Sequence, residues 1–165
     1  MEITEAKASY GATATDQAKP EAQFFSLKSN LLSQGSHTTY VAQSELLSLA
    51  VKIYASGGEN KMHMHPEEDH SFIVMQGQAT FHVGSDDNIR IVNKNEGVML
   101  PAGTCYWFLS SAEENLVMVR IGAARKPPAV WRAFADGHPF DTETIVGRKK
   151  RNPPEFAPGQ FFGSN

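Results

Sequence analysis

The feature that most constrains the fold of this chain is the regular return of short apolar segments between residues 47 and 121, each followed by turn-forming residues. In the first segment apolar side chains alternate with polar or small ones, as in a β-strand with one buried face; the apolar positions are Leu47, Leu49, Val51 and Ile53. Similar segments follow at 71–75, 79–83, 89–92, 98–100, 106–109 and 116–121. Because strands at a spacing of roughly 8–12 residues are typical of antiparallel sheets, the sequence predicts an all-β barrel or two-sheet jelly roll.

Length, charge and cysteine content narrow the function classes. A chain of 165 residues can bury one sizeable core and is expected to form one main domain. A net charge of −3 gives no strong field to attract nucleic acid or an anionic membrane, and no apolar run is long enough to span a bilayer. Cys105 is the only cysteine, which excludes an intrachain disulfide, and the acidic N-terminal residues do not resemble a secretory signal. We therefore expect a cytoplasmic protein that binds neither nucleic acid nor membranes.

The sequence divides into three parts. Residues 1–22 are small and polar, which predicts a flexible N-terminal segment. Residues 23–125 contain the strand-like segments and are expected to form the β-barrel domain. Residues 126–165 contain many prolines and several aromatic residues, and we expect them to wrap around the barrel or a partner subunit. In this last part, one or two helical turns would place Trp131 and Phe134 together on the barrel.

Half of the six histidines fall within eight residues, at His63, His65 and His70. On a strand, side chains two positions apart share a face, so His63 and His65 can point the same way. His70 on the following strand would add a third imidazole, and imidazole suits zinc, copper, iron and nickel. The cluster therefore predicts a site for one divalent metal ion, with a position left for water or substrate.

The surroundings of these histidines resemble the first motif of the cupin superfamily, usually written Gly-x5-His-x-His-x(3–4)-Glu-x6-Gly. Gly57, His63, His65 and Gly77 stand at four of its fixed positions, and His70 stands where the family commonly has glutamate. The resemblance implies a cupin-type antiparallel β-barrel, or double-stranded jelly roll, with extended N- and C-terminal segments in this chain.

A later stretch resembles the second cupin motif, usually Gly-x5-Pro-x-Gly-x2-His-x3-Asn. Pro101 and Gly103 match it, whereas Tyr106 replaces the last metal-binding histidine, Asn95 the first glycine and Ser110 the asparagine. Cupins include dioxygenases, isomerases, decarboxylases, lyases, cyclases, sugar-binding modules and storage proteins. The resemblance therefore implies the fold more closely than the chemistry.

The usual cupin site has three histidines and one glutamate, which leaves two interpretations of the ligand set here. In the first, His63, His65 and His70 bind the ion without a carboxylate, which would make it a stronger Lewis acid. In the second, Glu68 replaces His70, because Glu68 has the same parity on the predicted strand. We expect one ion per chain, Fe(II) or Zn(II), with Mn(II) or Ni(II) as alternatives.

Tyr106 allows three interpretations. As a phenolate it could bind iron directly, as a phenol it could donate a hydrogen bond to the substrate or act as acid or base, and otherwise it simply fills the barrel. The predicted substrate pocket is apolar and aromatic apart from the metal, and its walls are Met64, Phe72, Val74, Met99 and Phe108. Such a pocket favours a small aromatic or carbonyl-containing substrate over a sugar phosphate.

Three functional hypotheses follow from the resemblance and the site. The first is a metal-dependent cupin enzyme acting on a small organic substrate, as an oxygenase if the metal is iron. The second is a redox-neutral isomerase, lyase or cyclase in which the metal is a Lewis acid and Tyr106 the acid or base. The third is a non-catalytic, ligand-binding cupin. Because cupin barrels commonly dimerise and a sheet edge needs covering, we also expect a homodimer.

Overall fold

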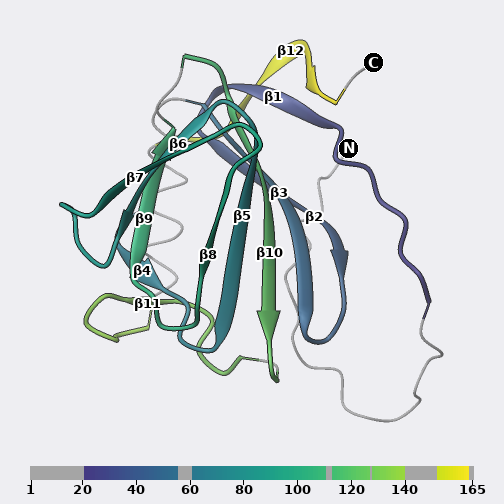
Figure 1. Ribbon diagram of the computed structural model, residues 1–165. Helices are drawn as coiled ribbons and strands as arrows, with labels where there is room; N and C mark the ends of the chain where they lie inside the picture. Colours follow the sequence, from purple (N-terminus) through teal and green to yellow (C-terminus); the bar gives the residue numbers. More distant parts are fainter. Residues whose placement is uncertain (1–20, 56–60, 111–112, 127, 140–151, 164–165) are drawn as a thin grey trace.

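The structure is a computed structural model that describes residues 21–55, 61–110, 113–126, 128–139 and 152–163. These residues form twelve strands and no helix, arranged as two five-stranded sheets and one two-stranded sheet. The two larger sheets form the two layers of a barrel (Figure 1). The prediction of an all-β jelly-roll barrel is confirmed.

The first sheet has the strand order β2-β3-β10-β5-β8, and every neighbouring pair is antiparallel. Its strands are β2 (Ser36–Gln43), β3 (Leu47–Tyr54), β10 (Leu116–Ala124), β5 (Glu68–Gln76) and β8 (Gly97–Leu100). β10 is central because it pairs with β3 on one side and with β5 on the other. The strand predicted at 71–75 begins three residues earlier, since Glu68 and His70 continue the inward alternation of Phe72 and Val74.

The second sheet has the strand order β11-β4-β9-β6-β7 and is also antiparallel. Its strands are β11 (Ala133–Phe134), β4 (His63–Met64), β9 (Tyr106–Ser110), β6 (Gln78–Val83) and β7 (Ile89–Asn93). The short strand β4 carries the start of the histidine motif and lies between β11 and β9. His63 is directly opposite Tyr106 in this sheet.

The space between the two large sheets is filled mainly by aromatic side chains. Phe72, Phe81 and Phe108 are each no more than 2% exposed, and their ring centroids lie 5.0 to 5.7 Å apart. Burying a phenylalanine stabilises a fold by about 2 kcal/mol relative to leaving it exposed. This cluster forms the apolar core of the barrel, next to the polar residues of the inner face.

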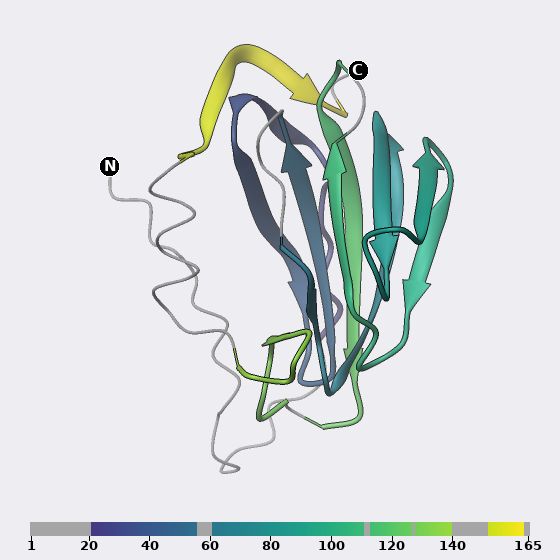
Figure 2. The same ribbon diagram turned by 90° about the vertical axis from the view of Figure 1, so that its left-hand side faces the viewer.

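A second apolar layer covers the outer face of the first sheet. Strands β1 (Ser29–Gln34) and β12 (Glu155–Phe162) pair with each other, and Leu32 of β1 packs on Val51, Ile53 and Val117. Figure 2 shows β12 arching over the end of the barrel that is opposite to β11. The first and last strands of the described chain are therefore joined on the outside of the barrel.

The C-terminal part of the chain returns to its own barrel twice, through β11 and through β12. The predicted helical turns around Trp131 and Phe134 are wrong, because Ala133 and Phe134 form a strand against β4. Pro128 and Gly137 flank this stretch and disfavour a helix, whereas the open edge of β4 offers backbone partners. Contact of this part with a partner subunit stays a prediction.

Some predicted features lie outside the described residues. They are residues 1–20 of the N-terminal segment and Gly57 of the first motif. Among the described residues, no helix is long and apolar enough to cross a membrane.

Asn115 fastens β1 to the barrel. Its side-chain Oδ1 accepts a hydrogen bond of 2.7 Å from the backbone nitrogen of Leu32, and its Nδ2 donates one of 2.9 Å to the Leu32 carbonyl. We expect Asn115→Ala to lower the free energy of unfolding by about 2 kcal/mol, because two hydrogen bonds to a buried residue are lost. Urea denaturation measures the change. The exposed neighbour Glu114 provides the control, and equal effects of Glu114→Ala and Asn115→Ala would contradict this role.

Candidate metal centre

The polar cluster at one end of the barrel comes from β4 and β5 and the connection between them. These two strands follow each other in the chain and belong to different sheets. His63 lies in β4 and His65 directly after it, and both are buried because residues two apart share a face. Glu68 and His70 begin β5, and both side chains point inward together with Phe72. The connection between the strands is short, so the two pairs of polar side chains face the same interior space.

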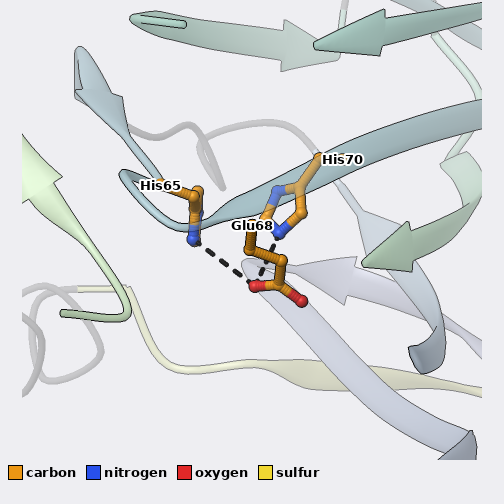
Figure 3. A group of neighbouring side chains, drawn as sticks. All are labelled: His65, Glu68 and His70. Carbon is orange, nitrogen blue, oxygen red and sulfur yellow. Dashed lines mark ion pairs between the residues drawn. The ribbon is translucent and has the colours of Figure 1, made fainter. Parts of the chain in front are cut away.

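Three of these side chains lie close enough together to hold one ion. The potential ligand atoms of His65, Glu68 and His70 are all within 4.8 Å of one another. Glu68 Oε2 lies 3.0 Å from His70 Nε2 and 3.9 Å from His65 Nδ1. Figure 3 shows the Glu68 carboxylate with both imidazoles directed toward it. The structure thus brings Glu68 and His70 together, whereas the sequence analysis treated them as alternatives.

Most ligand atoms of this cluster have no hydrogen bond within the described residues. Both ring nitrogens of His65, the Oε2 atom of Glu68 and the Nε2 atom of His70 are fully buried without one. His70 Nε2 and Glu68 Oε2 are also in close electrostatic contact with each other. Buried polar atoms are normally satisfied, and a cation between them would satisfy all three residues. Two imidazoles and one carboxylate form a donor set that fits a divalent ion such as Fe(II) or Zn(II).

The histidines of the site are neutral at physiological pH. Burial, followed by the charge of Arg132, lowers the pKa of His63 to about 2. Burial also lowers the pKa of His65 and of His70, with smaller contributions from neighbouring positive charges. Burial works to raise the pKa of Glu68, but its contact with His70 and the charge of Arg120 lower it overall. The site therefore already holds the protonation states that metal binding requires.

A hydrogen bond fixes how the His63 ring is protonated, and a second one orients the His70 ring. His63 Nδ1 lies 2.7 Å from the Lys61 carbonyl, which can only accept, so Nδ1 carries the proton and Nε2 keeps a lone pair. His70 Nδ1 lies 3.1 Å from the hydroxyl of Tyr106. When His70 Nδ1 donates to this hydroxyl, His70 Nε2 is available as a ligand, which is the usual arrangement in metal sites. His63 stands beside the three-residue cluster, with its ring centroid 5.4 Å from that of His65, and can serve as a fourth ligand.

A glycine on the central strand makes room for the carboxylate. Gly122 of β10 pairs with His70 on one side and with Ser48 on the other. A Cβ atom at this position would collide with Glu68 Oε1 and would lie 2.8 Å from Ser48 Oγ. Glu68 therefore occupies, on the inner face, the space that a side chain at residue 122 would fill.

Three of the predicted pocket residues lie inside the barrel. Phe72 borders the site, because its ring centroid is 5.9 Å from that of His70 and 5.8 Å from that of Tyr106. Val74 and Phe108 belong to the same buried aromatic core, and both are no more than 1% exposed. Tyr106 is 3% exposed and burial raises the pKa of its hydroxyl well above the ordinary value, so it remains a neutral phenol.

The other two predicted pocket residues do not face the interior. Met99 is 64% exposed on β8, because its neighbours Val98 and Leu100 take the inward positions. Met64 alternates with the two buried histidines beside it, and its Cε atom lies near Gly137 of the C-terminal segment. The prediction that these two methionines line the substrate pocket is wrong, since the strand alternation directs both of them away from the site.

The positive charge around the site was not predicted from the sequence. Arg120 lies on the inner face of β10 and is 4% exposed, and its charge, like those of Lys52 and Arg132, affects the pKa of the buried histidines. Trp131 also reaches the site, with its ring centroid 5.6 Å from that of His65. The burial of Arg120 could have been predicted from the sequence. Arg120 is the single charged residue in an otherwise apolar strand, and it stands at a position whose side chain points inward.

The comparison with known families agrees with this geometry. Residues 50–122 match the family model described as the cupin domain. Residues 50–122 therefore form a cupin domain. No curated protein sequence matches it.

Solved structures with the same fold are distant in sequence. A conserved protein with a double-stranded β-helix domain from Klebsiella pneumoniae aligns with a TM-score of 0.57 and 19% identity over 68% of this cupin and 96% of that chain. The cupin domain of Cnp3 from Schizosaccharomyces pombe gives 0.52 and 18%, over 56% and 67% of the two chains. DMSP lyase DddQ from Ruegeria pomeroyi gives 0.50 and 15%, over 62% and 53%. At these identities the similarity shows the fold alone.

The buried neutral histidines make the stability of this cupin depend on pH. His63, His65 and His70 have folded-state pKa values below the unfolded value of 6.5, so only the unfolded chain gains their protons as the pH falls from 6.5. We expect the metal-free protein to lose about 1.4 kcal/mol of stability per pH unit for each histidine in this range. Urea denaturation at pH 7.5 and at 5.5 with a chelator measures the loss. His65→Gln should reduce the slope of stability against pH by the contribution of one histidine. An unchanged slope in this variant would contradict the prediction.

Gly122→Ala tests the packing of the carboxylate. The added Cβ would displace Glu68, whose carboxylate is the flexible partner in the collision, so the protein should still fold. We expect the affinity for a divalent ion to fall at least about tenfold, as for the loss of a supporting residue in a metal site. Titration with Zn(II) in the presence of a competing chelator measures the affinity. Ala123→Ser, an exposed change at the neighbouring residue, is the control and should bind as the wild type does.

Proposed function

We propose that this cupin is a metal-dependent enzyme that acts on a small organic molecule. The proposal is carried by one observation, the buried group of His65, Glu68 and His70 whose ligand atoms lie within 4.8 Å of one another and are largely without hydrogen bonds. A barrel stabilised only by packing would gain nothing from burying a carboxylate beside three imidazoles, because each buried polar atom without a partner is unfavourable.

In this proposal His65, Glu68 and His70 hold the ion, and His63 with its fixed Nε2 lone pair adds a fourth ligand. The ion, Fe(II) or Zn(II) before Mn(II) or Ni(II), would supply Lewis acidity to the substrate, or redox chemistry if it is iron. Imidazole and carboxylate ligands suit Fe(II), and positions left open on such an ion would admit substrate and oxygen, which supports oxygenase chemistry as the first candidate. Catalytic zinc sites use the same donors, so a redox-neutral isomerase, lyase or cyclase is the second.

Tyr106 is best understood as the residue that orients His70. Its hydroxyl lies 3.1 Å from His70 Nδ1, and its raised pKa keeps it protonated, which opposes a role as general base or phenolate ligand. As a neutral phenol its oxygen can accept a hydrogen bond from His70 Nδ1–H, and its hydroxyl can still donate a hydrogen bond to a substrate oxygen. Phe72 shields one side of both residues from water.

The remaining expectations accompany this proposal. We propose a small-molecule substrate, no nucleic-acid or membrane partner, a cytoplasmic location and a homodimer. The homodimer is supported by apolar side chains left exposed on β7 and β8, where Ile91 is 58% and Met99 64% exposed.

Metal content and ligand substitutions test the proposed function. The protein would be purified without a metal-affinity tag and analysed by elemental mass spectrometry, with an anaerobic sample to retain iron. We expect about one ion per chain, and a loss of affinity of at least about tenfold in each of His65→Ala, Glu68→Ala and His70→Ala. His138→Gln is the control, because its side chain is 81% exposed and its ring contacts Asp136.

The outcomes separate the candidates. Iron, together with oxygen uptake in a substrate screen, supports the oxygenase, whereas zinc, manganese or nickel supports redox-neutral chemistry. If the protein contains no metal and takes none up after reconstitution, the metal-dependent function is wrong and a non-catalytic cupin remains. If Glu68→Ala keeps the wild-type affinity, the ligands are the three histidines alone.

A further inference from the structure

We propose that Arg120 binds a carboxylate group of the substrate, so that this cupin acts on a small carboxylic acid. As a statement about the substrate, this inference rests on the proposed function. It adds a residue from β10, the strand that pairs with β5 in the same sheet, and a charge that the substrate must carry.

The position of Arg120 places it next to the metal cluster. It lies on the inner face of β10, two residues before Gly122, whose space is occupied by the Glu68 carboxylate. Side chains two apart on a strand are separated by roughly 7 Å along it. The cross-strand neighbours of Arg120 are Ala50 on β3 and Phe72 on β5. Because Ala50 is small, the guanidinium can lie across β3 and remain inside the barrel.

The hydrogen bonds of Arg120 leave its charge uncompensated. Its Nη2 donates to Ser48 Oγ at 3.0 Å and to the Tyr40 hydroxyl at 3.4 Å, and the guanidinium carbon lies 5.3 Å from the Tyr40 ring centroid. Its Nε is fully buried and has no hydrogen bond within the described residues. Hydroxyl groups orient a guanidinium but carry no negative charge, and a buried arginine is normally paired with an anion.

Glu68 is the obvious internal partner, but it is engaged elsewhere. Its closest ionic contacts among the described residues are with His70 at 3.0 Å and His65 at 3.9 Å. No ion pair within 4.0 Å joins Glu68 to Arg120 in the part of the chain that the structure describes. The charge of Arg120 still reaches this carboxylate, since it helps to lower the pKa of Glu68. Glu68 therefore offsets Arg120 only at a distance.

The wider charge distribution points the same way. The charged side chains that affect the pKa values of the four polar residues of the site are three cations, Lys52, Arg120 and Arg132, and one anion, Glu68. A divalent ion would add two more positive charges. A neutral substrate would leave this excess uncompensated, whereas an anionic substrate would reduce it.

A carboxylate suits this position better than other anions. Planar guanidinium groups bind carboxylates by charge-assisted hydrogen bonds, and the unused Nε–H is a donor for one carboxylate oxygen. The cross-strand neighbours of Arg120 are Phe72 and the small Ala50, which suit a compact organic acid better than a bulky one. A phosphate would need several further donors, and Arg120, the only arginine in the five described strands of this sheet, already uses Nη2 for Ser48 and Tyr40.

Titration with matched acids and amides tests the inference. Acetate and benzoate would be compared with acetamide and benzamide, and with inorganic phosphate, at constant ionic strength by NMR. Each titration would be made with metal-free protein and with Zn(II)-loaded protein. The variants are Arg120→Gln, Arg120→Lys and the control Arg90→Gln, which changes an exposed arginine on β7.

We expect the wild type to bind the acids more tightly than the amides, and Arg120→Gln to lose at least about tenfold in affinity for the acids alone. Arg120→Lys keeps the charge without the planar fork, and it should bind the acids several-fold more weakly while folding as the wild type does. Arg90→Gln should change nothing. If Arg120→Gln does not fold, Arg120→Lys decides.

Equal binding of acids and amides by the wild type would overturn the inference, as would wild-type affinity for the acids in Arg120→Lys and Arg120→Gln. Preference for phosphate would overturn the choice of a carboxylate. The proposed function fails separately: a protein that binds acids through Arg120 but binds no metal would refute the metal-dependent enzyme and leave an acid-binding barrel. A protein that binds metal but binds acids and amides equally would refute only the role of Arg120.

Discussion

The carboxylate of Glu68 can lie inside the barrel because Gly122, on the neighbouring strand β10, has no side chain. Once buried, that carboxylate must be compensated, since an isolated charge in an apolar interior is very unfavourable. His65 and His70 lie against it, and Arg120 contributes positive charge from the next position along β10. None of these polar groups would be tolerated alone among the phenylalanines of the core. The polar residues at this end of the barrel therefore depend on one another for their burial.

Most of the barrel could be predicted from the sequence because its strands alternate along their length and end at turns. Segments such as 79–83 and 106–109 carry enough local information to be placed without knowledge of their partners. The strand Ala133–Phe134 does not, because two residues have no pattern of their own and pair only where the edge of β4 is open. Local propensity favoured a helical turn there, and a tertiary contact decided otherwise.

The candidate site could be predicted to the extent that it depends on the alternation of side chains between the two faces of a single strand. Parity correctly gave Glu68 and His70 a common face, and it would have excluded Met99 had the alternation of Val98 and Leu100 been applied consistently. What parity cannot supply is which strands become neighbours. The environment of Arg120 is made by residues from β2, β3 and β5, so neither its burial nor its hydroxyl partners could be known before the sheet order was.

The pairing of β11 with β4 has a consequence for the order in which the protein forms. His63 and His65 come early in the chain, but the strand that covers their edge comes much later, after β10 is complete. During synthesis the N-terminal part emerges first, and contacts between distant segments form slowly because a long loop must close. Until β11 is made, one backbone edge of β4 stays unpaired, and an unpaired edge is prone to pair with other chains. We expect nascent chains that end before residue 133 to aggregate more readily than the finished protein, and loading of an ion to belong to the last stage of its maturation.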